Sequence, residues 1–121
     1  MNERELIERY NDAWNAHDLD AIALMHAPDV VFHNYSANER AEGADAVRAH
    51  IAQIFSNSPD IRFRGRRLYA RDGLVVNEWT ATATRDGQML EWDGIDVFPI
   101  EDGKIKRKDV YSGFGVARVV G

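Results

Sequence analysis

The pattern that sets the fold lies in the second half of the chain, where residues 61–112 read IRFRGRRLYARDGLVVNEWTATATRDGQMLEWDGIDVFPIEDGKIKRKDVYS. Asp-Gly occurs three times between strand-forming runs, at residues 72–73, 86–87 and 102–103. Because this dipeptide tolerates the positive φ angles of tight hairpins, each occurrence indicates a turn between antiparallel strands. The stretch predicts a four-stranded antiparallel meander. Its strands are expected at 61–71, 74–84, 88–100 and 104–112.

The first half of the chain is typical of helices that flank one strand. Apolar residues at helical spacing indicate a helix from about residue 3 to 16, with Asn2 and Glu5 in a capping-box arrangement. Asp18 is a typical N-cap for a short second helix, which Pro28 is expected to end. The remaining expected elements are a strand over 29–35, a polar loop over 36–42 and a third helix over 43–55.

Helices followed by a long meander indicate an α+β fold, in which the helices cover one face of a curved sheet. The length of 121 residues matches one domain spanning residues 1–121. The absence of cysteine excludes disulfides, thiolate metal sites and a cysteine nucleophile.

The charge balance bears on possible partners. With 15 basic and 20 acidic side chains, the net charge of −5 argues against nucleic acid as the main partner. No apolar run approaches the roughly 20 residues of a membrane span, so we expect no membrane segment. The charged residues 1–9 do not resemble a signal peptide, and we expect a cytoplasmic protein.

The charge is also uneven along the chain. Residues 1–60 hold 11 acids and 4 bases, a net of −7, whereas residues 61–121 hold 9 acids and 11 bases, a net of +2. Five arginines lie between residues 62 and 71. A solvated strand face is the favoured interpretation of this cluster, and an anion or partner site is the alternative.

Alternation along 88–100 places Trp92, Gly94, Asp96 and Phe98 on one face. That face is aromatic and should be the core side, where desolvation favours the protonated form of Asp96. Because no salt-bridge partner is evident nearby, a functional acid or hydrogen-bond donor is favoured over a structural aspartate. A neutral Asp96 would bring the effective charge closer to −4.

Other polar and aromatic residues are expected to face inward. Tyr10 and Trp14 share one helix face, with core packing as the alternative role. Phe32 and Asn34 share one strand face, and Trp79 alternates with polar neighbours.

The sequence lacks the common motifs of metal and nucleophile chemistry. Its four histidines have no metal-ligand spacing, and it has neither a Gly-rich phosphate loop nor a nucleophile elbow. We therefore expect no metal and no cofactor. Asp109 follows a basic run, and such a position is more typical of an ion-paired strand residue than of a catalytic one. Asp109 nevertheless remains a catalytic candidate.

The element order and three short motifs, Asp-Leu-Asp-Ala-Ile at 18–22, Gly-Ala-Asp-Ala-Val-Arg at 43–48 and Asp-Gly-Lys-Ile at 102–105, resemble the nuclear-transport-factor-2-like superfamily. Within it, the chain is most similar to the SnoaL-like polyketide cyclases and ketosteroid isomerases. The resemblance implies a cystatin-like cone, in which a curved antiparallel sheet wraps N-terminal helices around an apolar pocket. It also implies a homodimer, with Val31, His33 and Tyr35 on the outer sheet face available for the contact.

The resemblance to ketosteroid isomerase implies an oxyanion hole. Tyr10, in an Arg-Tyr pair, matches the hydrogen-bonding tyrosine, and Asp96, in Ile-Asp-Val-Phe, matches the protonated aspartate. The position of the general-base aspartate holds Asn34, and an amide has no useful basicity near neutral pH. Asp109 or His33 would have to replace that base.

The resemblance implies a small-molecule acid/base enzyme, an isomerase, cyclase or dehydratase, that acts on an apolar carbonyl compound. The substrate-binding candidates are Trp14, Phe32, Phe55, Trp79 and Trp92. One alternative is a non-catalytic module that binds a carbonyl or phenol-like ligand. Another is a hydrolase like limonene-epoxide hydrolase, whose water-holding asparagine matches Asn34 and whose second aspartate lies near Asp109. Its other polar positions hold Phe32, Trp79 and Ala81 here. A protein-interaction role for the outer sheet face is a weaker alternative.

Overall fold

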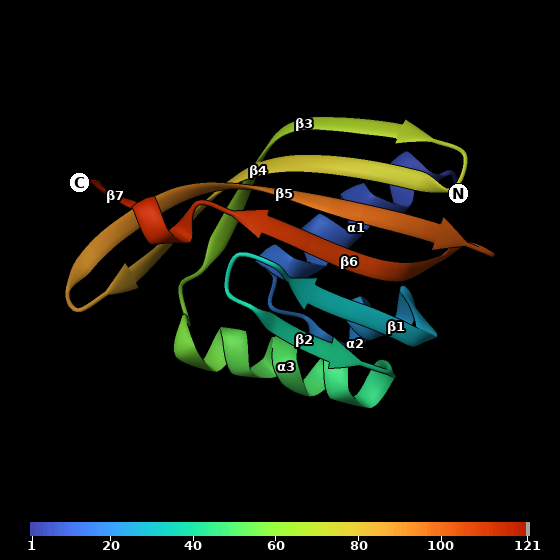
Figure 1. Ribbon diagram of the computed structural model, residues 1–121, viewed down its shortest axis with the longest axis horizontal. Coiled ribbons are helices and arrows are strands. Elements are labelled where there is room, and N and C mark those ends of the chain that lie inside the picture. The colour runs from blue at the N-terminus through green and yellow to red at the C-terminus, as the bar shows by residue number, and fades with distance from the viewer. Residues whose placement is uncertain (121) are drawn as a thin grey trace.

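The computed structural model describes residues 1–120. Three helices and a seven-stranded sheet make up the chain (Figure 1). The first half contains α1 (Glu3–Asn15), α2 (Leu19–Leu24), β1 (His26–Asn34), β2 (Glu39–Glu42) and α3 (Ala44–Asn57). The second half contains β3 (Arg62–Arg71), β4 (Leu74–Arg85), β5 (Gln88–Glu101), β6 (Lys104–Ser112), the 3-10 turn η1 (Phe114–Val116) and β7 (Arg118–Val120). The α+β class is confirmed.

The predicted meander is present as β3 to β6, and each consecutive pair of strands is antiparallel. Its three turns contain Gly73, Gly87 and Gly103, all with φ between 73° and 77°. In two of these turns the preceding aspartate, Asp86 or Asp102, also has a positive φ. The Asp-Gly pairs therefore take the backbone conformation that tight hairpins require.

The sheet order is β2-β1-β6-β5-β4-β3, and β7 pairs with β5. Because β1 lies parallel to β6, the sheet is mixed rather than wholly antiparallel. The predicted loop over 36–42 is wrong in its second half, where β2 pairs with the last four residues of β1. β2 is a polar edge strand, so it carries no apolar alternation from which a strand can be predicted.

Pro28 does not end the second helix as expected. α2 ends at Leu24, and Pro28 lies inside β1. The pairing of β1 with β6 is irregular between His26 and Val31, and β2 pairs with β1 only from Val31 onward. A proline is tolerated there because this part of the strand needs no regular ladder hydrogen bond from residue 28.

The curved sheet packs against α1, and α3 lies below β1 and β2 in the view of Figure 1. The side chain of Asn2 accepts a hydrogen bond from the Glu5 amide at 2.8 Å and so caps α1 as expected. The buried face of α1 consists of Leu6, Ile7, Tyr10, Ala13 and Trp14. No helix among residues 1–120 is long and apolar enough to cross a membrane.

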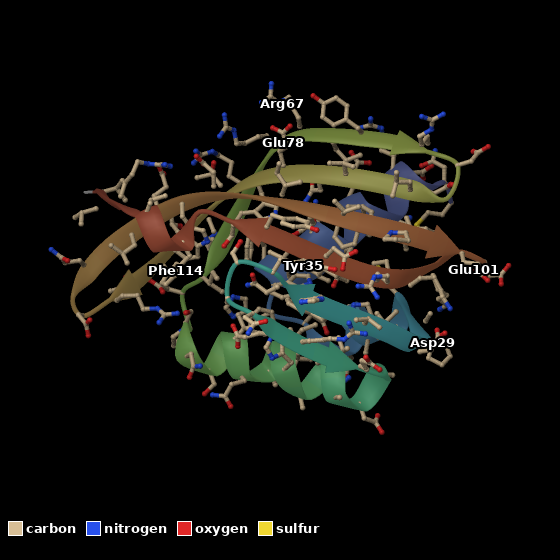
Figure 2. All side chains as sticks on the ribbon, viewed as in Figure 1. Asp29, Tyr35, Arg67, Glu78, Glu101 and Phe114 are labelled. Carbon is tan, nitrogen blue, oxygen red and sulfur yellow. The ribbon has the colours of Figure 1, made fainter. Side chains whose placement is uncertain are left out.

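The arginines of β3 lie on an exposed strand, as the favoured interpretation expects. Arg67 pairs with Glu78 at 2.8 Å, and the two lie together at one edge of the sheet (Figure 2). Arg66 pairs with Asp93 at 3.3 Å. These surface ion pairs neutralise part of the cluster and contribute little to stability.

A close contact between two neighbouring strands fixes the position of the Trp79 side chain. Trp79 on β4 is the register partner of Gly94 on β5. A Cβ atom placed on Gly94 would lie 2.2 Å from the Trp79 indole, well inside van der Waals contact. Only a glycine at this position lets the indole lie across β5.

Gly94→Ala is expected to lower the free energy of unfolding by about 1–3 kcal/mol, because the added methyl group must displace the Trp79 ring. Gly65→Ala is the matched control. Gly65 faces Trp79 from β3, but a Cβ there meets no atom within 4 Å. Chemical denaturation of the two variants measures the difference, and equal unfolding free energies would contradict the role given to Gly94.

Candidate functional site

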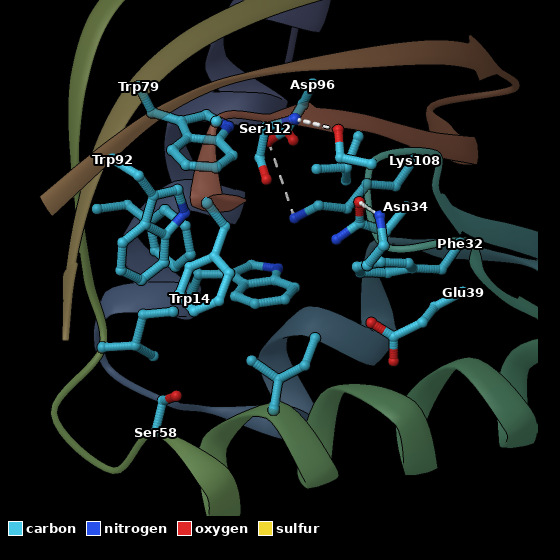
Figure 3. Close-up of a pocket in the computed structure, with 18 of the residues that line it drawn as sticks. Trp14, Phe32, Asn34, Glu39, Ser58, Trp79, Trp92, Asp96, Lys108 and Ser112 are labelled. Atoms are coloured by element: carbon cyan, nitrogen blue, oxygen red, sulfur yellow. Dashed lines mark hydrogen bonds and ion pairs between the residues drawn. The ribbon is translucent and has the colours of Figure 1, made fainter. Parts of the chain in front are cut away.

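A cavity of about 630 Å³ opens between the concave face of the sheet and α3 (Figure 3). Its walls combine aromatic and other apolar side chains with a set of polar ones, as is typical of small-molecule sites. The aromatic lining residues are Trp14, Phe32, Phe63, Trp79, Trp92 and Phe114. The polar lining residues include Asn11, Asn34, His50, Asn77, Asp96 and Lys108.

Two opposite charges lie inside this cavity. Lys108 on β6 is 6% exposed and Asp96 on β5 is 4% exposed. The Lys108 Nζ atom lies 3.9 Å from Asp96 Oδ2, an ion pair without a direct hydrogen bond. Figure 3 shows the amine of Lys108 pointing into the cavity. Asp96 therefore has the salt-bridge partner that the sequence did not reveal.

Aromatic rings surround the lysine amine. Its Nζ lies 3.7 Å from the ring centroid of Trp14, 4.9 Å from that of Tyr10 and 5.5 Å from that of Phe32. Such ring faces attract an ammonium group. They also exclude water, and desolvation disfavours any charged form.

Burial moves the pKa values of the pair toward each other. Burial lowers the pKa of the Lys108 amine to about 8, although the charge of Asp96 opposes the shift. Burial also raises the pKa of the Asp96 carboxyl, although the charge of Lys108 opposes that shift. Burial therefore disfavours the doubly charged pair relative to the arrangement in which both groups are neutral and the proton lies on Asp96.

Several buried polar atoms at this site have no protein partner. Asp96 Oδ1 and Trp79 Nε1 make no hydrogen bond within residues 1–120. The indole of Trp79 and the amide of Asn77 lie near enough to Asp96 to oppose the rise of its pKa, but neither satisfies hydrogen-bond geometry with Oδ1. Buried polar atoms without partners are rare, and they mark positions where a ligand atom or water can bind.

The structure places Tyr10 behind the cavity wall. Its side chain is fully buried, and its hydroxyl is hydrogen-bonded to His26 Nε2 at 2.9 Å. Burial raises the pKa of Tyr10. Tyr10 is absent from the lining residues, although the charge of Asp96 acts on its hydroxyl and adds to the rise of its pKa. The ring of Tyr10 instead packs beneath the Lys108 amine.

The candidate bases also lie apart from the expected arrangement. Asn34 lines the cavity, and its Oδ1 accepts a hydrogen bond from the Ala37 amide at 3.2 Å. Asp109 does not line the cavity but pairs with Arg107 at 2.9 Å, because strand alternation turns it away from Lys108. His33 stacks on Tyr35 outside the cavity.

Four of the five substrate-binding candidates, Trp14, Phe32, Trp79 and Trp92, lie in the cavity wall. The fifth, Phe55, lies outside the lining. It packs edge-on against Trp14 and stacks on His17 with ring centroids 4.1 Å apart. Helical spacing places Phe55 on the inner face of α3, but it does not give the depth of a side chain in the core.

Two cavity residues, Lys108 and His50, were not predicted, although the spacing of their apolar neighbours places both on the inner side. Lys108 lies two residues before Val110 on β6, so alternation from that apolar residue places it inside the sheet. His50 lies on the same helical stripe as Val47 and Ile54. Its ring packs edge-on against Phe32, with centroids 4.9 Å apart.

Comparison with known proteins gives one family match. The model of the SnoaL-like domain matches residues 7–108. None of the curated proteins compared with the chain matches it.

Solved structures share the fold at low identity. A protein from Jannaschia sp. CCS1, provisionally described as a SnoaL-like polyketide cyclase, is 21% identical with a TM-score of 0.84, covering 93% of this chain and 85% of that one. A cystatin-fold protein from Novosphingobium aromaticivorans is 22% identical with a TM-score of 0.80, covering 91% and 97%. A provisionally described ketosteroid isomerase from Kribbella flavida DSM 17836 is 20% identical with a TM-score of 0.78, covering 90% and 76%. These matches confirm the expected cystatin-like fold.

Acidification from pH 6.5 toward pH 4 is expected to lower the free energy of unfolding. Burial, assisted by the charge of Lys108, lowers the pKa of His26 from 6.5 to about 4 in the folded chain. Between these two values the unfolded chain binds the additional proton, so stability falls as the pH falls, by at most about 3 kcal/mol. Chemical denaturation at closely spaced pH values measures the slope.

His26→Gln is the matched control for this slope. Glutamine keeps an acceptor for the Tyr10 hydroxyl but does not titrate in this range. The pH profile of the variant should be flatter between pH 4 and 6.5, and an unchanged profile would assign the slope to another group.

Proposed function

The chain belongs to the SnoaL-like domain family, and we propose that it is a small-molecule acid/base enzyme that acts on an apolar carbonyl compound. The observation that carries the proposal is the Asp96–Lys108 pair, which lies buried in a cavity with aromatic walls. Titratable pairs whose pKa values are shifted by burial are concentrated at catalytic sites.

The cavity favours a flat, apolar substrate with its carbonyl oxygen at the polar end. The indoles of Trp14, Trp79 and Trp92 offer surfaces against which such a molecule packs. A protonated Asp96 donates a hydrogen bond to the carbonyl oxygen and stabilises the charge that develops there.

A neutral Lys108 then accepts a proton from the carbon next to the carbonyl. Asp96 delivers its proton to the oxygen, so an enol forms and the pair becomes Asp96 carboxylate and Lys108 ammonium. Return of a proton to a different carbon completes an isomerisation. Cyclases and dehydratases of carbonyl compounds use the same first step, and the descriptions of the Jannaschia and Kribbella proteins fit this reaction class.

Two alternatives are weaker. A non-catalytic binding module is favoured by Asn34 at the position of the usual base, where its amide oxygen is held by Ala37. A hydrolase like limonene-epoxide hydrolase needs polar groups that activate water, whereas Phe32, Trp79 and Ala81 are buried apolar residues. Asp109, the remaining candidate for that set, faces away from the cavity.

The protein is expected to catalyse exchange of the α-hydrogens of 2-tetralone, a flat apolar ketone, with deuterium from solvent. Asp96→Asn should slow this exchange by about 100-fold, because it removes the proton donor to the carbonyl oxygen. The rate should fall as the pH increases above about 8, because the Asp96–Lys108 pair then loses the one proton that Asp96 must donate. Proton NMR in deuterated buffer measures the exchange.

Asp109→Asn is the control, because it removes a carboxylate from β6 outside the cavity. If 2-tetralone does not exchange but 2-naphthol quenches the fluorescence of the cavity tryptophans, the chain is a binding module. Exchange that is equal in Asp96→Asn and Asp109→Asn would remove Asp96 from the mechanism.

We also propose that the chain forms a homodimer through the outer sheet face. His33 stacks on Tyr35, and Tyr35 stacks on Tyr111, with ring centroids 3.7 Å and 4.8 Å apart. Tyr35 and Tyr111 are nevertheless 43% and 47% exposed, and Ile95 lies opposite Tyr111 on β5 with 40% exposed. A second copy that covers this patch removes apolar surface from water.

Tyr111→Lys is expected to shift the chain to a monomer at micromolar concentration, because it puts a charge in the centre of the contact. Tyr69→Lys is the control, since Tyr69 is similarly exposed on the distant strand β3. Sedimentation velocity distinguishes the species. A monomeric parent chain would contradict the homodimer.

A further inference from the structure

The three lysines of the chain, at positions 104, 106 and 108, differ in what their amines contact. The Nζ atom of Lys104 donates to the Leu24 carbonyl at 2.6 Å, and that of Lys106 donates to both Asp29 oxygens at 2.8 Å. The nearest carboxylate oxygen to Lys108 Nζ is 3.9 Å away, beyond hydrogen-bonding distance. Lys108 therefore presents an amine to the cavity that no carboxylate engages directly.

The surroundings of Lys108 favour a nucleophilic amine. Its side chain is buried, and its nitrogen lies 3.7 Å from the ring centroid of Trp14. Burial lowers the pKa of the amine to about 8, so a substantial neutral fraction exists near neutral pH. A lysine that is desolvated in an apolar pocket is a typical Schiff-base nucleophile.

We infer that Lys108 forms a Schiff base with an aldehyde or ketone that enters the cavity, and that Asp96 carries the protons for this reaction. The inference rests on the proposed function, because it requires that the cavity takes a carbonyl compound. In place of Lys108 as the base that accepts the carbon proton, it makes Lys108 the residue that forms a covalent bond and Asp96 the base.

Lys108 and Asp96 supply every proton and electron pair that the formation of the Schiff base requires. The lone pair of Lys108 Nζ forms a bond to the carbonyl carbon, the C=O π electrons move to oxygen, and Asp96 donates a proton to that oxygen. The nitrogen then returns a proton to the Asp96 carboxylate, which gives a neutral carbinolamine. Asp96 donates this proton to the hydroxyl group, which leaves as water as the C=N bond forms. In total, the neutral Lys108 amine, the protonated Asp96 and the carbonyl compound give an iminium ion, the Asp96 carboxylate and water, with no proton taken from solvent.

A Schiff base explains how the site works with Asn34 at the position of the usual base. A protonated imine withdraws electrons more strongly than a ketone, so the hydrogen on the neighbouring carbon becomes more acidic. The Asp96 carboxylate that remains after water leaves is then a sufficient base for it, and a strong separate base is not needed.

A charged Lys108 that only attracts an anionic ligand, such as a phenolate or carboxylate, is the competing explanation. It uses the same cavity and the same charge, but it forms no covalent bond. Lys108→Arg separates the two, because arginine keeps the positive charge and cannot form a Schiff base under these conditions.

Reductive trapping tests the inference on the full chain. 2-Naphthaldehyde is incubated with the protein in the presence of sodium cyanoborohydride, which converts a Schiff base to a stable secondary amine. Peptide mapping by mass spectrometry then locates the naphthylmethyl group. At pH 7 we expect Lys108 to be labelled on the order of 100-fold faster than Lys104 and Lys106, because a much larger fraction of its amine is neutral.

Substitutions of Lys108 and Lys106 show whether the label depends on the Lys108 amine. Lys108→Met and Lys108→Arg should abolish this label, whereas Lys106→Met, which removes the lysine that pairs with Asp29, should keep it. Mapping of the unsubstituted chain needs no variant, so a variant that fails to fold does not affect the test. Equal labelling of the three lysines, or of the α-amine alone, would overturn the inference.

Labelling of Lys108 and exchange of 2-tetralone together distinguish a failure of the Schiff base from a failure of the proposed function. If Lys108 is not labelled but 2-tetralone still exchanges in a manner that depends on Asp96, the Schiff base fails and the acid/base function stands. If Lys108 is labelled but 2-tetralone does not exchange, the reactive lysine stands and the enolisation fails.

Discussion

The structure is organised around one ion pair held in an aromatic shell on the concave side of its sheet. Removing a carboxylate and an ammonium from water costs several kcal/mol per ion, and a pair at 3.9 Å without a direct hydrogen bond recovers only part of that cost. The ring faces of Trp14 and Tyr10 beside Lys108 offset a further part. A pair that is so incompletely satisfied does not serve stability, so its presence is better explained by chemistry.

Close packing between side chains of neighbouring strands shapes the cavity wall. Gly94 gives the Trp79 indole, which lines the cavity, the room to lie across β5. Two residues from Gly94 on β5, Trp92 packs edge-on against Phe114 of η1 with centroids 4.9 Å apart, and Arg85 lies over the Phe114 ring. η1 and β7 cover the end of the long β5 strand, where Phe114 is visible in Figure 2. Apolar walls on several sides raise the energetic cost of charge at the polar end.

Most of the fold but only part of the site can be predicted from the sequence. Alternation and Asp-Gly turns predicted β3 to β6, and the same alternation placed Asp96 inside. Lys108 was missed because it follows Lys106 and Arg107, and a run of bases is usually a solvated face. The contact of Tyr10 with His26 joins a helix to a strand whose start depends on the irregular pairing around Pro28. No local pattern reports such a contact, because it follows from how α1 packs against β1.

The pair also changes how the charge of the chain is counted. A neutral Asp96 on its own would bring the net charge from −5 to −4, as the sequence suggested. If Lys108 is neutral at the same time, one negative and one positive charge disappear together and the net charge stays at −5. The protonation of the site is therefore hidden from any measurement of total charge. It affects instead the reactivity of the Lys108 amine and proton transfer to a bound carbonyl group.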